Sequence, residues 1–130
     1  MSDGPILGVL VAHGAMAQGM VDAVVKIAGA DEAAIVPLSN EGVNPQVIVD
    51  RLNELVGDHP AVIFTDLTSG SCTVAARITC RDCGHRVVVA GVNLPMLLDF
   101  VFNRSLPLDE LVPRLLDRGR AGVRSVPTFE

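Results

Sequence analysis

The sequence contains four short apolar runs rich in β-branched residues, at residues 6–12, 33–38, 61–65 and 86–92. Within these runs apolar residues follow one another instead of alternating with polar ones. Such continuous apolarity is typical of strands that are covered on both faces, as in a parallel sheet. Segments with helical spacing separate the runs. Because strand and helix alternate, right-handed crossovers predict an α/β three-layer sandwich, a four-stranded parallel sheet with helices on both faces.

Start and stop signals delimit the predicted helices. Gly29 follows the first helix, and the second begins at the N-cap Asn44 and stops at Gly57. The fourth begins at Pro95, and Gly119 is expected to terminate the fifth. The 130 residues suffice for one domain with a real core, so we expect a single domain over residues 1–130. Residues 121–127 are expected to form a short fifth strand, which must pair at an edge of its own sheet or of a neighbour's in a dimer.

Composition and charge exclude several classes of protein. No apolar run approaches the ~20 residues that span a bilayer, and no basic stretch precedes the first apolar run, so we expect a cytoplasmic protein. The net charge is -5, and the nine arginines and Lys26 are scattered along the chain, which argues against nucleic acid as a partner. Nucleotide-binding glycine motifs are absent, so a phosphoryl donor is expected to be a protein.

Three cysteines, Cys72, Cys80 and Cys83, make an odd count, so no disulfide framework is expected. Cys80 and Cys83 form a C-x-x-C pair, but a zinc site needs two further ligands and His85 is the nearest candidate. We therefore expect neither a metal site nor a cofactor.

Two polar residues follow strands that should be neighbours. His13 comes after the first apolar run and Asp66 after the third. Because ligands of open parallel sheets bind outside the carboxyl ends of the strands, we expect these side chains to face each other across one cleft. An aspartate that accepts a hydrogen bond from one imidazole nitrogen leaves the other nitrogen as a nucleophile or base. His59 and His85 lie at strand entries on the opposite rim, and we expect no function for them.

The segment LTSGSCT, residues 67–73, leads into the third helix and contains Ser69, Gly70, Ser71 and Cys72. Backbone N–H groups of this helix start, with the Ser71 hydroxyl, can hold the oxygens of a phosphoryl group. With His13 as nucleophile they predict a covalent phosphoryl-transfer site. Structural roles are the alternative, since aspartate and serine also cap helices and turns.

Four segments occur in an order and spacing that resembles the enzyme IIA domains of the mannose class of the bacterial phosphoenolpyruvate-dependent sugar phosphotransferase system. The segments are GVLVAHGAMAQGM from residue 8, VIFTDLTSGS from residue 62, VVVAGVNLPMLLDF from residue 87 and RGRAGVRSV from residue 118, and the likeness covers nearly the whole chain. The most specific part is AGVNLPML, residues 90–97.

The resemblance implies a phosphoryl carrier. His13 matches the histidine that takes a phosphoryl group from the histidine-containing phosphocarrier protein and passes it to a IIB domain, which phosphorylates sugar entering through a membrane permease. Asp66 matches the aspartate that pairs with it, and Ser71 the serine of a Gly-Gly-Ser-Pro loop. The resemblance also implies a homodimer that exchanges a C-terminal strand, and residues 121–127 fit that strand.

The loop departs from the family pattern, because Ser69 replaces the first glycine and Cys72 replaces the proline. Cys72 regains an N–H that proline lacks, which enlarges the anion-binding nest. Its place at a helix N-terminus predicts a lowered pKa of the thiol.

Three other functions stay open at the level of sequence. The first is the related phosphotransfer subunit of dihydroxyacetone kinase, against which the GVNLPML segment argues. The second is a regulatory protein whose phosphohistidine is a signal without sugar transport. The third is a cysteine-dependent phosphatase, which needs a C-x5-R loop, whereas only four residues separate Cys72 from Arg77.

Overall fold

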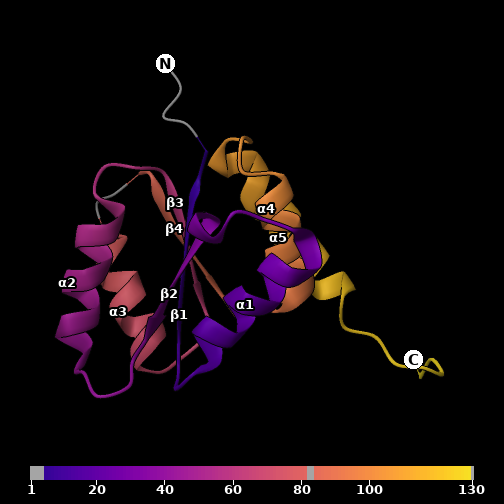
Figure 1. Ribbon diagram of the computed structural model, residues 1–130, viewed down its shortest axis with the longest axis horizontal. Helices are drawn as coiled ribbons and strands as arrows, with labels where there is room; N and C mark the ends of the chain where they lie inside the picture. Colours follow the sequence, from indigo (N-terminus) through magenta and orange to yellow (C-terminus); the bar gives the residue numbers. More distant parts are fainter. Residues whose placement is uncertain (1–4, 82–83, 130) are drawn as a thin grey trace.

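The computed structural model describes residues 5–81 and 84–129, and Cys83 of the C-x-x-C pair lies outside this part. Figure 1 shows a sheet between two layers of helices. Within the described residues, the sheet has four parallel strands in the order β2-β1-β3-β4, which confirms the predicted architecture. The strands are β1 (Leu7–Ala12), β2 (Ile35–Ser39), β3 (Ala61–Thr65) and β4 (Arg86–Ala90).

The strand register brings the carboxyl ends of β1 and β3 together. Val11 of β1 lies opposite Thr65 of β3 and, on its other side, opposite Leu38 of β2. His13 and Asp66 therefore leave the sheet at the same rim from adjacent strands, as the sequence predicted.

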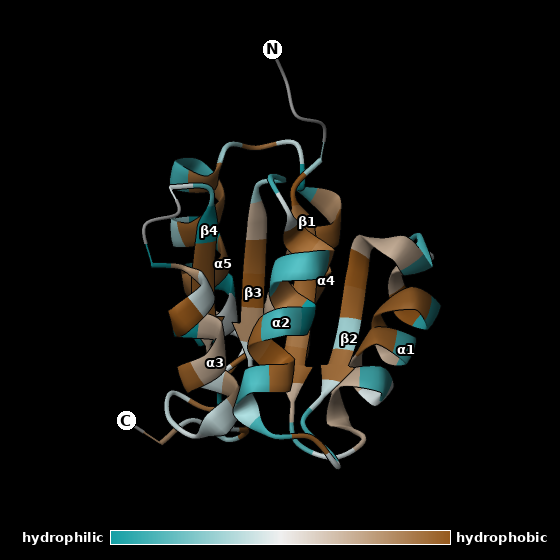
Figure 2. Cartoon of the chain, turned by 90° about the vertical axis from the view of Figure 1, so that its left-hand side faces the viewer, coloured by the Kyte–Doolittle hydropathy of each residue, from teal (hydrophilic) through white to brown (hydrophobic). Residues whose placement is uncertain are grey.

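The helices divide between the two faces of the sheet (Figures 1 and 2). One face is covered by α1 (Met16–Ala28), α4 (Leu94–Phe102) and α5 (Leu108–Ala121). The other is covered by α2 (Pro45–Val56) and α3 (Ser71–Thr79). A 3-10 turn, η1 (Glu32–Ala34), leads into β2. The chain changes side after β2, so β1 and β3 flank the topological switch point, where ligands of such sheets bind.

Two apolar cores fill the space between sheet and helices, and Figure 2 shows hydrophobic strands beneath helices whose polar residues face outward. On the α1/α4/α5 face, the rings of Phe64 and Phe100 meet edge to face, with centroids 5.2 Å apart. Gly8 of β1 makes room for this pair, because a Cβ there would lie 2.7 Å from the Phe100 ring. The α2/α3 face includes Leu52 and the fully buried Cys72. Cys72 is thus part of the core as well as of the first turn of α3.

Most helix boundaries confirm the sequence signals. Gly29 and Gly57 follow α1 and α2 with positive φ, and Asn44 caps α2 by accepting a hydrogen bond from the Val47 N–H at 3.1 Å. The prediction for Gly119 is wrong, because this residue lies inside α5. Its role is close packing: a Cβ at Gly119 would lie 2.6 Å from the terminal methyl of Met96 on α4.

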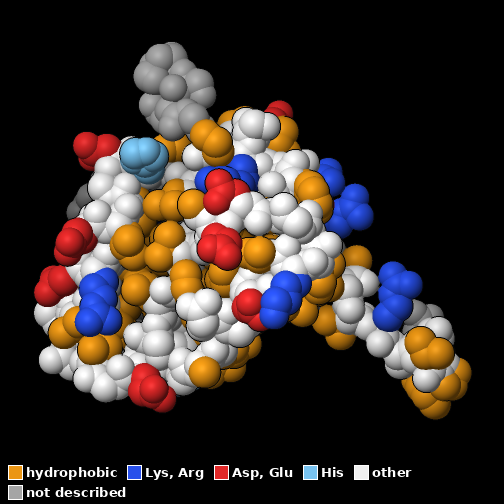
Figure 3. All heavy atoms as spheres, in the orientation of Figure 1, with side chains coloured by type: hydrophobic (Ala, Val, Ile, Leu, Met, Phe, Trp, Pro, Cys, Tyr) orange, Lys and Arg blue, Asp and Glu red, His pale blue; other side chains and the backbone are white. Residues whose placement is uncertain are grey.

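The C-terminal segment differs from expectation. α5 continues through Ala121, and residues 122–129 form no strand in this single chain. A strand needs the hydrogen bonds of a neighbour, and Figure 1 shows this segment leading away from the body of the molecule. Its apolar side chains are exposed, with Val126 at 93% and Phe129 at 80% (Figure 3). Exchange of this segment between subunits stays a prediction.

Across the described residues, no helix combines the length and the apolar character required to traverse a lipid bilayer.

Candidate active site

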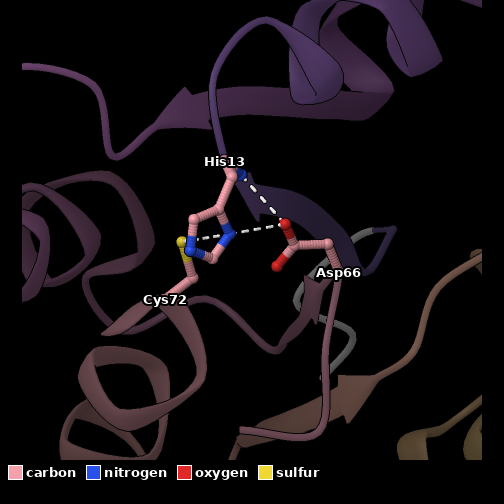
Figure 4. A group of neighbouring side chains, drawn as sticks. All are labelled: His13, Asp66 and Cys72. Atoms are coloured by element: carbon pink, nitrogen blue, oxygen red, sulfur yellow. Dashed lines mark hydrogen bonds and ion pairs between the residues drawn. The ribbon is translucent and has the colours of Figure 1, made fainter. Parts of the chain in front are cut away.

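His13 and Asp66 form a directly bonded pair at the carboxyl ends of β1 and β3. A single carboxylate oxygen, Oδ2, accepts the backbone N–H of His13 at 2.9 Å and lies 2.7 Å from its ring Nδ1 (Figure 4). The Asp66 side chain is 7% exposed and the His13 side chain 45%. The carboxylate is therefore buried beneath an imidazole that solvent and a partner protein can reach.

Electrostatics keep Asp66 ionised at neutral pH. Burial by itself would raise the pKa of Asp66, but the backbone and ring hydrogen bonds from His13 and the attraction of its charged form outweigh burial. The net result is a pKa below the ordinary 3.8. Because an ionised carboxylate only accepts hydrogen bonds, Nδ1 of His13 carries the ring proton. The lone pair then lies on Nε2, which makes no hydrogen bond within residues 5–81 and 84–129.

The end of β2 holds the turn that follows His13. The Gly14 N–H donates to Oδ1 of Asn40 at 3.3 Å, and the Ser39 hydroxyl donates to the Gly14 carbonyl at 2.7 Å. Sequence analysis missed both residues. The signal was available, because Ser39 and Asn40 follow the strand that pairs with β1 on its other side.

The loop before α3 lies against the imidazole. Gly70 has a φ of 101°, and a Cβ there would lie 3.8 Å from Cε1 of His13. Ser71 opens α3, and the N–H groups of a first helical turn have no acceptor within their own helix. The structure thus brings Gly70 and the start of α3 to the His13–Asp66 pair. Ser69 is exposed in the preceding loop.

Two buried threonines fix this loop to the sheet. The hydroxyls of Thr65, on β3, and Thr73, on α3, lie 2.8 Å apart, and both bond to the Leu67 carbonyl. Because this carbonyl belongs to the loop itself, hydrogen bonds from β3 and from α3 both fix the backbone of the loop between Asp66 and Gly70. Sequence analysis gave no sign of this, since a threonine in an apolar strand is an ordinary β-former.

Cys72 approaches the imidazole from the first turn of α3. Its Sγ lies 3.8 Å from Nδ1 of His13, and the residue is fully buried. Burial, and then the charge of Asp66, raise the pKa of the thiol, although a hydrogen bond from Ser71 opposes them. The predicted lowering is therefore wrong, because desolvation outweighs the helix dipole at this position.

The remaining histidines lie outside this constellation. Nε2 of His85 is 3.3 Å from the Gly57 carbonyl, at the rim where β4 begins. The contacts of His13 described above place a half-exposed imidazole with a fixed tautomer beside a helix N-terminus. This arrangement suits a nucleophile that acts on an anionic group.

Comparison with known proteins agrees with the family resemblance seen in the sequence. A family model described as PTS system fructose IIA component matches residues 8–114. The mannose/sorbose specific IIA subunit of the phosphotransferase system from Enterococcus faecalis is 27% identical, with a TM-score of 0.83 over 97% of this chain and 98% of that one. No curated protein matches the sequence.

Two further structures show the fold alone. Phosphotransferase system component EIIA from Streptococcus agalactiae is 24% identical, with a TM-score of 0.87 over 94% of this chain and 98% of that one. A sigma-54 interaction domain protein from Enterococcus faecalis is 12% identical, with a TM-score of 0.75 over 92% and 94%. Since the family model spans most of the residues, the chain belongs to the mannose-class IIA components of the bacterial sugar phosphotransferase system.

Proposed function

We propose that the protein carries a phosphoryl group on Nε2 of His13, taken from the histidine-containing phosphocarrier protein and handed to a IIB domain during sugar uptake. Membership of the IIA family implies the general role of a phosphoryl carrier. The observation that supports the specific site is the 2.7 Å contact between Nδ1 of His13 and Oδ2 of Asp66, beneath a half-exposed ring.

The transfer follows from the tautomer. The Nε2 lone pair attacks phosphorus, and the bond from phosphorus to the donor's imidazole nitrogen breaks as the new bond forms. Positive charge that develops on the His13 ring is stabilised by Asp66 through the Nδ1–H hydrogen bond. The ring proton stays on Nδ1 throughout. The reverse attack, by a residue of the IIB domain, releases the group again.

The start of α3 supplies the stabilisation that a dianionic phosphoryl group requires. Backbone N–H groups from Gly70 to Thr73 and the Ser71 hydroxyl are the proposed partners of the phosphoryl oxygens, with the Ser69 hydroxyl at the edge of the loop. Cys72 contributes an N–H where the family loop has proline, so this nest has one more donor.

We further propose that the protein acts in the cytoplasm as a homodimer and reaches the membrane only through the permease subunits that its IIB partner serves. The C-terminal residues 122–129 support the homodimer, because their apolar side chains are exposed in the single chain.

Incubation with phosphoenolpyruvate, enzyme I and the phosphocarrier protein tests the site. We expect one phosphoryl group on the peptide that contains His13, lost in acid and kept in alkali, and none in His13→Ala. His85→Ala is the matched control and should be labelled like the wild type. Labelling of His13→Ala at another residue would overturn the proposal.

Asp66→Asn tests the orienting role. An asparagine can present its N–H₂ group to the ring and favour the wrong tautomer, so transfer should slow by at least about 10-fold; the same replacement behind a triad histidine costs about 10⁴-fold. Stopped-flow or quench measurements of phosphoryl acceptance give the rate, and an unchanged far-UV spectrum confirms folding. A wild-type rate in Asp66→Asn would exclude this role.

A further inference from the structure

Three side chains with different ligand chemistry meet at one point of the site. One ligand atom each from His13, Asp66 and Cys72 lies within 4.8 Å of the other two, and Figure 4 shows the three side chains turned toward one another. Nδ1 of His13 is 2.7 Å from Oδ2 of Asp66 and 3.8 Å from Sγ of Cys72. They come from β1, β3 and α3, so the fold itself assembles the group.

One atom of this group lacks a partner. Both hydrogen bonds from His13 go to Oδ2 of Asp66, and the other oxygen, Oδ1, is buried without any hydrogen bond in the described structure. The side chain is 7% exposed, so solvent contributes little. A buried, charged oxygen without a partner is unusual and unfavourable in folded proteins. The carboxylate as a whole therefore has spare capacity to coordinate a cation next to the imidazole and the thiol.

The ligand set selects the kind of cation. Imidazole nitrogen, thiolate sulfur and carboxylate oxygen are all zinc ligands, and usual bond lengths in tetrahedral geometry place such atoms about 3.4–3.6 Å apart. The 3.8 Å between Nδ1 and Sγ is about 0.2 Å longer than this range, and the 2.7 Å between Nδ1 and Oδ2 is about 0.7 Å shorter. Side-chain shifts of this size bring the imidazole to ligand separations from both partners. A thiolate disfavours Mg²⁺ and Ca²⁺, which take oxygen ligands.

We propose that His13, Asp66 and Cys72 form a binding site for Zn²⁺ or a similar thiophilic divalent cation, with the fourth position open to water. One thiolate and one carboxylate neutralise the dication. The half-exposed His13 ring borders the site and provides the access route.

The site has a consequence that rests on the proposed function. On binding, Cys72 releases its thiol proton to solvent, Nδ1 of His13 gives its lone pair to the metal, and the ring proton moves to Nε2. Nε2 then has no lone pair with which to attack phosphorus. Metal and phosphoryl group therefore exclude each other, and Zn²⁺ acts as a reversible inhibitor of phosphoryl acceptance. This also reverses the expectation from sequence, which considered only the C-x-x-C pair as a metal site.

Co²⁺ titration of the full chain, freed of metal with a chelator, tests the site independently of any phosphoryl transfer. We expect one Co²⁺ per chain with a thiolate-to-cobalt charge-transfer band in the near ultraviolet. Cys72→Ser should lose the band and bind Co²⁺ at least about tenfold more weakly, the minimum expected when even an outer partner of a metal site is removed. Cys80→Ser is the control thiol and should behave like the wild type. Absence of the band in the wild type, or its persistence in Cys72→Ser, overturns the site.

Phosphoryl acceptance in the presence of Zn²⁺ tests the inhibition. The wild type should be inhibited and recover on addition of a chelator. The rate of Cys72→Ser, whatever its value without metal, should not change when Zn²⁺ is added to the same donor mixture. Equal inhibition of both proteins would show that Zn²⁺ acts on the donors and would overturn the regulatory claim. If neither protein accepts a phosphoryl group without metal, the proposed function fails, while the Co²⁺ result still decides the metal site.

Discussion

At the scale of single residues, the attachment of His13 to Asp66 controls both the position and the chemistry of the ring. One carboxylate oxygen accepts the backbone N–H and the ring Nδ1–H of the same residue. The imidazole is thereby fixed relative to its own main chain, and the proton is held on the nitrogen that faces the protein interior. Such pre-organisation lowers the reorganisation needed at the moment of transfer.

The lowered pKa of Asp66 predicts a specific dependence of stability on pH. As pH falls, the unfolded chain takes up the proton at the ordinary pKa of 3.8 before the folded protein does. The contribution of Asp66 to the free energy of unfolding is therefore complete above about pH 4 and is lost as pH falls through the lower folded value. Asp66→Asn should be less stable than the wild type by about 1–3 kcal/mol at pH 7, typical of a lost charged hydrogen bond.

Urea unfolding of both proteins from pH 7 to pH 3 measures this difference, which should narrow below about pH 4. Asp22→Asn is a suitable control, because Asp22 pairs with Lys26 on the exposed surface of α1, with its side chain 57% exposed. Its loss should change the free energy of unfolding by about 0.5 kcal/mol or less. A difference for Asp66→Asn that does not vary with pH would contradict the assignment of the lowered pKa.

Gly70→Ala should impair transfer more than stability. The backbone of Gly70 has φ 101° and ψ 176°, a region open almost only to glycine, and a side chain there costs about 1–3 kcal/mol. Since Gly70 lies against Cε1 of His13, relief of this strain should displace the loop at the proposed phosphoryl site. Acceptance should fall about 10–100-fold, as for small misplacements of reacting groups.

Gly29→Ala provides the comparison, because Gly29 also has a positive φ but lies at the end of α1 with open space around it. It should lose about 1–2 kcal/mol of stability while accepting phosphoryl groups at the wild-type rate. Equal transfer rates in the two variants would show that the conformation of Gly70 is unimportant for the site.

At the scale of elements, the GVNLPML segment has a structural explanation in the packing of α4 on α5. Asn93 caps α4 by accepting the Met96 N–H at 3.1 Å, and its Nδ2 donates to the Gly119 carbonyl at 2.8 Å. That carbonyl lies in the last turn of α5, where acceptors lack helical donors. The Asn93 side chain therefore provides a hydrogen-bond partner both for an N–H group at the start of α4 and for a carbonyl at the end of α5. Gly119 allows the two helices to pack closely.

Asn93→Ala should therefore cost more than the loss of an ordinary cap. The cap contributes about 1 kcal/mol and the bond to the Gly119 carbonyl about 1 kcal/mol more. Asn44→Ala removes only a cap, that of α2, and should cost about 1 kcal/mol. Denaturant unfolding of the two variants gives the difference, and equal losses would mean that the bond between α4 and α5 contributes nothing.

The sequence was informative about these elements wherever one local rule decides a boundary. Continuous apolarity located all four strands, and the glycines after α1 and α2 marked positive φ. Gly119 was misread because a glycine that ends a helix and one that permits close packing look alike until the neighbouring helix is known. The pairing of His13 with Asp66 followed from strand order, whereas the thiol of Cys72 beside the ring depended on side-chain packing that no spacing rule expresses.

At the scale of the whole molecule, the change in the face on which the crossover helices lie brings the residues of the site together at one rim of the sheet. His13 follows β1, Asp66 follows β3, residues after β2 hold Gly14, and the start of α3 lies against the ring. These four elements do not form one local segment of the sequence, so the geometry of the site depends on how the central strands pair.

The exposed C-terminal segment predicts a change of assembly on truncation. Removal of residues 123–130 takes away Val126 and Phe129, which have no cover in the single chain, and leaves α5 intact. If this segment pairs with a neighbouring sheet, the truncated protein should shift from dimer to monomer in sizing chromatography with light scattering. Its far-UV spectrum should stay close to that of the full chain. A truncated protein that remains dimeric would show that subunits join through another surface.

The central place of β1 in the sheet also has a consequence for biosynthesis. His13 emerges early from the ribosome, yet its partner carboxylate lies 53 residues further along the chain. During synthesis the contact between these two side chains cannot form until the third strand has been made and has paired with the first. The rim that holds the imidazole is therefore completed only after the central strands of the sheet are in place.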